Sequence, residues 1–307
     1  MKKLILGTFF VGSSLFAQYD GMLLTDDLGL LVNNNNVSYK AVKYYPKKYY
    51  GRSNEYYNIL PYMGIMGYTG TTTKSVGVVS GLYLSDFKSP WKTEFDVEYS
   101  LIKYKDNTPT LKQNDFTLLV NYFQGYNLAY KFGIHYISST DELTNLGKIF
   151  TLELLYYKTL KYNIGIDYYY SDYSNSTTPT TIKQISPKFG FNIGDYYSAI
   201  GSFYIETKID YIQANKNYSS TEFKFNNYNG NFTTSLGIWM GERSFEVAKA
   251  GFVVNNSSIK QTGGFSISES YKIDKTSTLK LEYSKTNFEE NGNSNSKVIL
   301  ASYSYSF

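Results

Sequence analysis

Hydrophobic and polar residues alternate along most of the chain, in short segments that begin near Tyr56. In one of the clearest segments, Ile164 and Ile166 alternate with Gly165 and Asp167. Successive side chains of a β-strand point to opposite faces, so each such segment predicts a strand with one apolar and one mixed polar face. Other segments with the same period are 91–101, 128–136, 185–193, 232–240 and 279–283.

The connections between these strands are predicted to alternate in length. Short turns are expected near Ser85–Pro90, Gly125–Asn127, Thr159–Tyr162, Gly194–Tyr196, Gly241–Ser244 and Ile273–Ser277. Longer polar loops are expected near Asp106–Asp115, Ser138–Lys148, Asp172–Thr181, Ile212–Ser220 and Glu289–Ser296. Short turns at one end and longer loops at the other are typical of transmembrane barrels, whereas a soluble β-sandwich has no reason to keep this rhythm.

The pattern predicts an all-β fold: a transmembrane, antiparallel, up-and-down β-barrel over residues 56–307 with about 14 strands. Alternative counts are 12 or 16. The segment Arg243–Asn255 is ambiguous. Either Phe245 and Val247 face lipid there, or Ala248, Ala250, Phe252 and Val254 do. We prefer the second register because it turns Lys249 away from the hydrocarbon.

The N-terminal region differs from the rest of the chain. Two lysines follow Met1, and an apolar run then extends to Ala17, which predicts a signal peptide over residues 1–17. Residues 18–55 are predicted to form an N-terminal extension: a plug, a periplasmic tail or an extra hairpin. Pro46 and the neighbouring lysines weaken the hairpin alternative, since proline is confined to sheet edges.

The composition agrees with strands that alternate and excludes several other classes of protein. The chain has 34 tyrosines and a mean hydropathy of −0.35, and no stretch after residue 17 is apolar enough for a transmembrane helix. A net charge of +4 argues against nucleic-acid binding. With no cysteine and one histidine, neither a thiolate site nor a multi-histidine metal site is expected. No phosphate-binding loop is present, so no cofactor is predicted.

The C-terminal segment carries aromatic residues at alternate positions, with Tyr303, Tyr305 and Phe307 on one face. This strand resembles the C-terminal β-signal of Gram-negative outer-membrane β-barrels of the porin-like type. The resemblance implies insertion into the lipid of the outer membrane and recognition by the barrel assembly machinery during biogenesis. The position of Ala301 differs from the commonest signal, in which a larger residue is frequent there.

The expected function is a porin-like channel or transporter for small solutes, acting as a monomer and not as an enzyme. Inward-facing charged residues are the candidates for pore-lining selectivity: Glu94, Asp96, Glu98, Lys131, His135 and Lys188. Glu94, Asp96 and Glu98 share one face and would favour cations, unless neighbouring lysines such as Lys92 neutralise them. Tyr169, Tyr204 and Trp239 could contact a sugar or an aromatic solute. No catalytic residue is proposed. The alternative function is a closed barrel that acts through its surface loops as an adhesin or structural protein.

Overall fold

The computed structural model describes residues 55–307 except 107, 126, 143, 159–160, 175–179, 195–199, 249–251 and 255–258. The predicted signal peptide lies outside the described residues, as does the N-terminal extension apart from Glu55. No helix that is long and apolar enough to cross a membrane is found in this described part of the chain.

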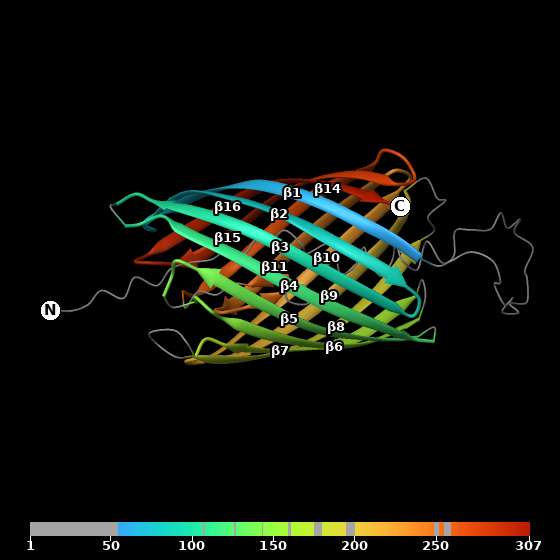
Figure 1. The fold of residues 1–307 in the computed structure, drawn as a ribbon, viewed down its shortest axis with the longest axis horizontal. Coiled ribbons are helices and arrows are strands. Elements are labelled where there is room, and N and C mark those ends of the chain that lie inside the picture. Colours follow the sequence, from blue (N-terminus) through green and yellow to red (C-terminus); the bar gives the residue numbers. More distant parts are fainter. Residues whose placement is uncertain are drawn as a thin grey trace, which may run out of the picture.

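Fourteen strands close into one antiparallel barrel, in which β1 pairs with β16 and every other strand pairs with its neighbours in order (Figure 1). The barrel strands are β1 (Glu55–Gly70), β2 (Lys74–Lys88), β3 (Trp91–Tyr104), β4 (Leu111–Gln124), β5 (Leu128–Ser139), β6 (Lys148–Lys158), β7 (Tyr162–Asp172), β8 (Thr181–Gly194), β9 (Ser202–Gln213), β10 (Asn217–Asn229), β11 (Phe232–Arg243), β14 (Gln261–Lys272), β15 (Ser277–Glu289) and β16 (Asn293–Ser306). The predicted all-β antiparallel barrel of about 14 strands is confirmed.

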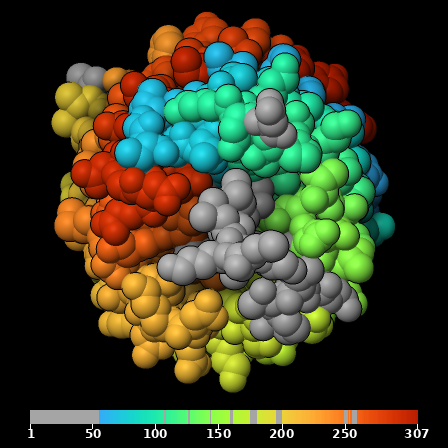
Figure 2. Space-filling model, turned by 90° about the vertical axis from the view of Figure 1, so that its left-hand side faces the viewer, coloured from blue at the N-terminus to red at the C-terminus, as the bar shows by residue number. Residues whose placement is uncertain are grey.

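The start of β1 and the end of the chain lie together at one end of the barrel, which we call the turn end (right in Figure 1). There the Tyr57 amide donates a hydrogen bond to the Phe307 carbonyl at 2.9 Å, and the Phe307 amide donates to the Tyr57 carbonyl at 3.0 Å. The opposite end is called the loop end, and Figure 2 shows its nearly circular rim. A closed barrel leaves no unpaired sheet edge, so the strands satisfy one another's backbone groups.

The lengths of the connections follow the predicted rhythm only in part. The connections 105–110, 140–147, 173–180 and 244–260 at the loop end are long, and 89–90 and 230–231 at the turn end are short. The predicted loops at Ile212–Ser220 and Glu289–Ser296 were placed too widely, since strand pairing leaves only 214–216 and 290–292 between strands. Asparagine and serine are common in loops, which is why these segments were predicted as loops. In the structure their backbone continues the pairing between neighbouring strands. The connection 195–201 at the turn end is longer than predicted.

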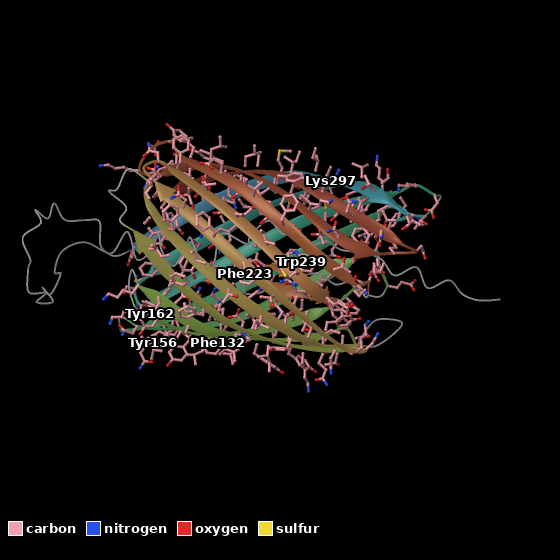
Figure 3. The ribbon with its side chains drawn as sticks, turned by 180° about the vertical axis from the view of Figure 1, so that it is seen from behind. Phe132, Tyr156, Tyr162, Phe223, Trp239 and Lys297 are labelled. Carbon is pink, nitrogen blue, oxygen red and sulfur yellow. The ribbon has the colours of Figure 1, made fainter. Side chains whose placement is uncertain are left out.

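The outward face of the barrel is apolar. Met63 and Ile65 on β1, Phe132 on β5 and Leu281 on β15 are each more than half exposed to solvent in the isolated chain. Phe132, Tyr156 and Tyr162 point away from the barrel in Figure 3. Aromatic pairs lie towards both ends: Trp91 with Tyr122 and Phe232 with Tyr271 at the turn end, and Phe150 with Tyr170 at the loop end. An apolar band between two aromatic girdles is the surface that a barrel presents to lipid.

The segment after β11 does not form the barrel strand predicted for Arg243–Asn255. The strands β12 (Val247–Ala248) and β13 (Val253–Val254) form a separate two-stranded sheet, which we call the inner hairpin. Ala248, Phe252 and Val254 are buried inside the barrel, so the predicted lipid-facing register is wrong. Both faces of this segment carry apolar residues, which suits a hairpin packed on two sides. The turn predicted at Gly241–Ser244 is likewise wrong, because β11 continues to Arg243.

Candidate functional site

The inner hairpin contacts two different walls of the barrel interior. On one side, Ala248 and Phe252 join a cluster of inward-facing side chains from β1 to β4, β15 and β16; the Phe252 ring lies 5.5 Å from that of Tyr83. On the other side, Val247 and Val254 join a cluster with inward-facing residues of β5 to β10. The hairpin therefore bridges the interior near the loop end and fills part of the space that the barrel encloses.

The side chain of Gln184 forms hydrogen bonds between the inner hairpin and the barrel wall. The Val247 amide donates to Gln184 Oε1 at 2.8 Å, and Gln184 Nε2 donates to the Val247 carbonyl at 2.7 Å. The glutamine side chain on β8 thus pairs with the backbone of β12 as a neighbouring strand would. A buried backbone group without a partner is unfavourable, so this pair of hydrogen bonds favours the inward position of the hairpin.

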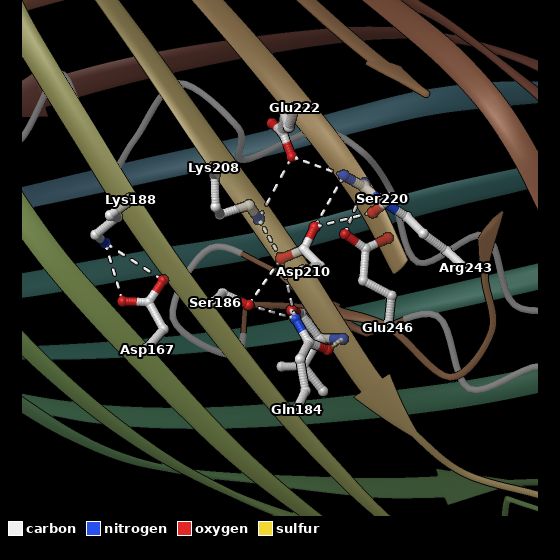
Figure 4. Close-up of polar contacts among 11 residues, drawn as sticks. Asp167, Gln184, Ser186, Lys188, Lys208, Asp210, Ser220, Glu222, Arg243 and Glu246 are labelled. Carbon is white, nitrogen blue, oxygen red and sulfur yellow. Dashed lines mark hydrogen bonds and ion pairs between the residues drawn. The ribbon is translucent and has the colours of Figure 1, made fainter. Parts of the chain in front are cut away.

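Next to Gln184 lies a group of two cationic and three acidic residues: Lys208, Arg243, Asp210, Glu222 and Glu246 (Figure 4). We call it the balanced cluster because each carboxylate in it contacts a cation. The Arg243 guanidinium lies 2.9 Å from Asp210, 3.2 Å from Glu222 and 2.7 Å from Glu246. Lys208 Nζ lies 3.4 Å from both Asp210 and Glu222. Because Glu246 belongs to the connection that carries the hairpin, Arg243 ties that connection to β9 and β10 as well.

The three carboxylates of the balanced cluster are close enough to be considered as a metal site. Oxygen atoms of Asp210, Glu222 and Glu246 lie within 4.8 Å of one another. Arg243 and Lys208 already contact these same carboxylates and supply positive charge there. The arrangement is thus accounted for by ion pairs within the protein, and we assign no metal to it.

Glu94, Asp96 and Glu98, which we call the acidic stripe, face inward on β3 and are buried as a row. The Tyr62 hydroxyl lies 3.2 Å from Asp96 and 3.0 Å from Glu98. Among the described residues Asp96 forms no ion pair, and its side-chain contacts both come from Tyr62.

Glu94 has partners of a different kind. It accepts hydrogen bonds from Tyr83 at 2.5 Å and from Asn121 at 2.6 Å, and Lys92 Nζ lies 3.8 Å away. Four lysines that could have neutralised the stripe contact other carboxylates: Lys131 and Lys188 pair with Glu153, Lys208 with Asp210, and Lys280 with Glu282.

The remaining predicted pore-lining residues also face inward. Lys188 Nζ lies 2.5 Å from Glu153 and 3.0 Å from Asp167, so it joins β6, β7 and β8. His135 lies between Thr117, whose Oγ1 is 2.8 Å from Nδ1, and Asp115, whose carboxylate is 3.3 Å from Nε2. Hydroxyl, imidazole and carboxylate occur in that order in serine hydrolases. Here all three side chains are buried, so the arrangement braces β4 against β5.

The tyrosines and tryptophan predicted for the lumen also lie inside. Tyr169 and Tyr204 are almost fully buried, and the Arg243 guanidinium lies 4.2 Å from the centre of the Trp239 ring. Trp239 alternates along β11 with the exposed residues Ile238 and Met240. At the turn end, Tyr303, Tyr305 and Phe307 point outward, as the resemblance to the β-signal implied.

Sequence reasoning missed Gln184, Arg243 and Glu246 as a group. A signal was present: Arg243 is one of only two arginines in a chain that otherwise uses lysine. Arginine forms several directed hydrogen bonds to carboxylates and is favoured in buried ion pairs. Its three partners are distant in sequence apart from Glu246, so the pattern of strands alone could not bring them together.

No family model matches the chain, and no curated protein matches it in sequence. Among solved structures, the CymD monoaromatic hydrocarbon channel aligns with a TM-score of 0.55 at 12% identity, covering 98% of this chain and 95% of CymD. A bacterial polysaccharide outer-membrane secretin aligns with a TM-score of 0.53 at 10% identity, covering 81% of this chain and 98% of the other. The fold is that of an outer-membrane β-barrel. At these identities the likeness concerns the fold.

Proposed function

We propose that this barrel is an outer-membrane channel for small solutes, in which the inner hairpin narrows the passage. The observation that carries the proposal is the contrast between the two surfaces of the barrel. The outward face is apolar between two aromatic girdles, whereas the inward face carries the charged residues described above. Such a barrel is suited to lipid outside and to polar solutes inside.

The comparisons support a channel without indicating its solute. CymD is a channel for monoaromatic hydrocarbons, and the secretin concerns a polysaccharide. The two names refer to chemically different molecules, although the two proteins share this fold. Function depends on the site and not on the fold. The solute class therefore has to be argued from the interior, where buried polar and charged residues outnumber buried hydrophobic ones among the described residues.

Within this proposal, the acidic stripe gives the channel a preference for cations. Asp96 and Glu98 share one tyrosine hydroxyl, while the lysines of β5, β8 and β9 are engaged with other carboxylates. Rows of acidic side chains in pores favour cations over anions. Lys131 and Lys188 then contribute mainly to ion pairs across the wall, and His135 contacts Thr117 and Asp115.

A second candidate function is a closed barrel that acts through its loops, and one observation favours it. Inward-facing charged residues are almost inaccessible to solvent: Asp210 is 0% exposed and Asp96 is 1% exposed. A wide water-filled pore would leave such side chains accessible. The channel should pass ions, and should pass more of them when the hairpin is removed. The closed barrel should pass no ions in either case.

Conductance in planar bilayers tests the proposal. The refolded protein is compared with a variant in which residues 246–258 are replaced by a short Gly-Ser linker, and with a control in which residues 106–109 are replaced in the same way. We expect small steps for the unmodified protein and the control, and larger steps for the hairpin variant. If all three insert and none conducts at any voltage, the channel function is wrong and the closed barrel is favoured.

The selectivity is tested by the reversal potential in a salt gradient. We expect Glu94→Gln, Asp96→Asn and Glu98→Gln together to reduce the cation preference of the hairpin variant. Glu269→Gln is the matched control, because Glu269 is exposed on the outward face of β14. An unchanged reversal potential in the triple variant would show that the acidic stripe does not set the selectivity.

A further inference from the structure

Two lysines lie directly opposite each other on the outward face of neighbouring strands. Lys285 on β15 and Lys297 on β16 are partners in the register of the antiparallel pair. Their neighbours in the strands, Ser284 and Val298, are buried, so the lysines point away from the barrel interior. Like charges directly opposite each other in a sheet are destabilising unless a counter-charge lies between them.

The chain itself supplies no such counter-charge among the described residues. Neither Lys285 nor Lys297 forms an ion pair or a side-chain hydrogen bond with any described residue. The outward carboxylate further along β15, Glu289, is instead 2.9 Å from Lys260. A pair of uncompensated cations on a lipid-facing surface therefore calls for an anion from outside the protein.

The position of the pair along the barrel indicates a lipid as the source of that anion. Lys285 is the register partner of Phe265, an outward aromatic residue in the half of β14 that is nearer the loop end. Aromatic girdles mark the level of the lipid headgroups. Closer to the turn end on the same two strands, Ile299 and Leu281 belong to the apolar band, which would contact acyl chains.

The surface beside the lysines has room for a headgroup. On β1 the register partner of Lys297 is Gly67, and a Cβ atom added there would meet no other atom within 4 Å. The absence of a side chain leaves an open space next to the Lys297 side chain. On the other side of the pair, the Phe265 ring offers an apolar boundary.

We propose that Lys285 and Lys297 form a binding site for the phosphate group of a lipid of the membrane leaflet at the loop end. The two ammonium groups would hold the phosphate at the level of the girdle, while the acyl chains lie along Ile299, Leu281 and Ile65 below. Lysines near the headgroup level strengthen the binding of anionic lipids, and a pair of them raises the affinity about tenfold or more. This inference rests on the barrel lying in a membrane, but it does not depend on conductance.

The test measures lipid binding by native mass spectrometry of the refolded barrel, with lipid A carrying two phosphates as the probe. The variant is Lys285→Gln with Lys297→Gln. The matched control is Lys103→Gln with Lys183→Gln, which removes two outward lysines that are not register partners at the same end. We expect about tenfold weaker binding in the variant and unchanged binding in the control. Dephosphorylated lipid A should bind all three proteins equally weakly.

Additional measurements distinguish a lipid site from a site for free phosphate and from a contact between two barrels. Lys285→Arg with Lys297→Arg should retain binding, because the charge is kept. Equal binding by the Gln variant and the unmodified protein would overturn the proposal. Displacement of lipid A by an equal concentration of inorganic phosphate would overturn the lipid as the source, and a cross-linked dimer lost with the two lysines would assign the surface to a second copy of the chain. Heat-dependent mobility in gels confirms folding separately, so these outcomes are distinct from a failure to conduct.

Discussion

The balanced cluster and the acidic stripe handle buried charge in different ways, although both lie inside the same barrel. In the balanced cluster, Arg243 and Lys208 contact three carboxylates at distances between 2.7 and 3.4 Å. In the acidic stripe, Asp96 and Glu98 share the hydroxyl group of Tyr62.

The difference corresponds to what each region has to do. The balanced cluster lies where the connection bearing the inner hairpin enters the barrel, and its ion pairs join Glu246 of that connection to β9, β10 and β11. The acidic stripe lies on β3, and Phe252 of the hairpin contacts Tyr83, which in turn donates to Glu94. We infer that the first region fixes the position of the hairpin and that the second keeps a negative potential beside it. Buried charges need partners or strong hydrogen bonds. Ion pairs predominate in the balanced cluster, whereas Asp96 and Glu98 accept hydrogen bonds from hydroxyl groups.

The largest expected effect comes from breaking the balanced cluster. Arg243→Met would remove the cation that contacts all three carboxylates, whereas Lys208 contacts Asp210 and Glu222. Removing one partner of a buried ion pair typically destabilises a protein by about 3–5 kcal/mol. We expect a loss of this order in the free energy of unfolding, measured by urea titration of the barrel in lipid vesicles, together with larger conductance steps because the hairpin loses its anchor.

Arg243→Lys serves as the control for charge alone. It keeps the positive charge but not the directed contacts to Asp210, Glu222 and Glu246, so an intermediate stability is expected. If Arg243→Met were as stable as the unmodified protein, the cluster would not be the anchor of the hairpin.

A smaller effect is expected from the matching change in the acidic region. Tyr62→Phe removes the hydroxyl that Asp96 and Glu98 share while keeping the ring. Hydrogen bonds to charged groups contribute about 1.5–3 kcal/mol, so we expect a loss of that order in the free energy of unfolding. The same urea titration measures it.

The combination with Asp96→Asn sharpens this test. In Tyr62→Phe with Asp96→Asn, one of the two adjacent carboxylates is neutral, and part of the lost stability should return. Sites that contact each other give non-additive changes of this kind. Strict additivity of the two substitutions would mean that the hydroxyl and the carboxylate do not interact.

The two regions also differ in how far the sequence predicts them. The alternation of residues 91–101 was enough to place Glu94, Asp96 and Glu98 on one inward face, because a strand repeats every two residues. The closed barrel and the approximate strand count followed from the same rule, although the count included a strand over residues 243–255 that the barrel does not contain. The contacts between strands could not be predicted in this way. The register between strands decides whether Tyr62 reaches Asp96 and whether Lys188 reaches Glu153, and the pattern of one strand does not contain that register.

The inner hairpin marks the point at which the pattern failed. Residues 243–255 contain alternating apolar positions on both faces, and a membrane strand was the simplest interpretation. In the structure both faces are covered, by the wall of β1–β4 and by that of β5–β10. Apolar side chains favour burial in either surrounding. Hydrophobicity therefore predicted that this segment is buried, but it could not distinguish lipid from the interior of the barrel.

The smallest expected effect provides a reference outside both regions. Asp274 lies in the connection 273–276 at the turn end, where it accepts hydrogen bonds from the Thr276 and Ser277 amides at 2.7 and 2.8 Å. These hydrogen bonds, with those of Thr276 first, hold the pKa of Asp274 below its ordinary value. A carboxylate whose pKa is depressed in the folded state stabilises that state above the pKa of the unfolded chain, and this contribution is lost as the pH falls through the lower folded-state value.

Asp274→Asn should therefore lower the urea midpoint slightly at neutral pH, and the difference from the unmodified protein should disappear in acid. Because Asp274 is fully exposed, solvent screens its charge and the change should be much smaller than that of either interior substitution. Conductance and selectivity should not change, since the turn lies at the opposite end from the inner hairpin. A change in conductance equal to that of Arg243→Met would show that the hairpin responds to general loss of stability and not to the balanced cluster.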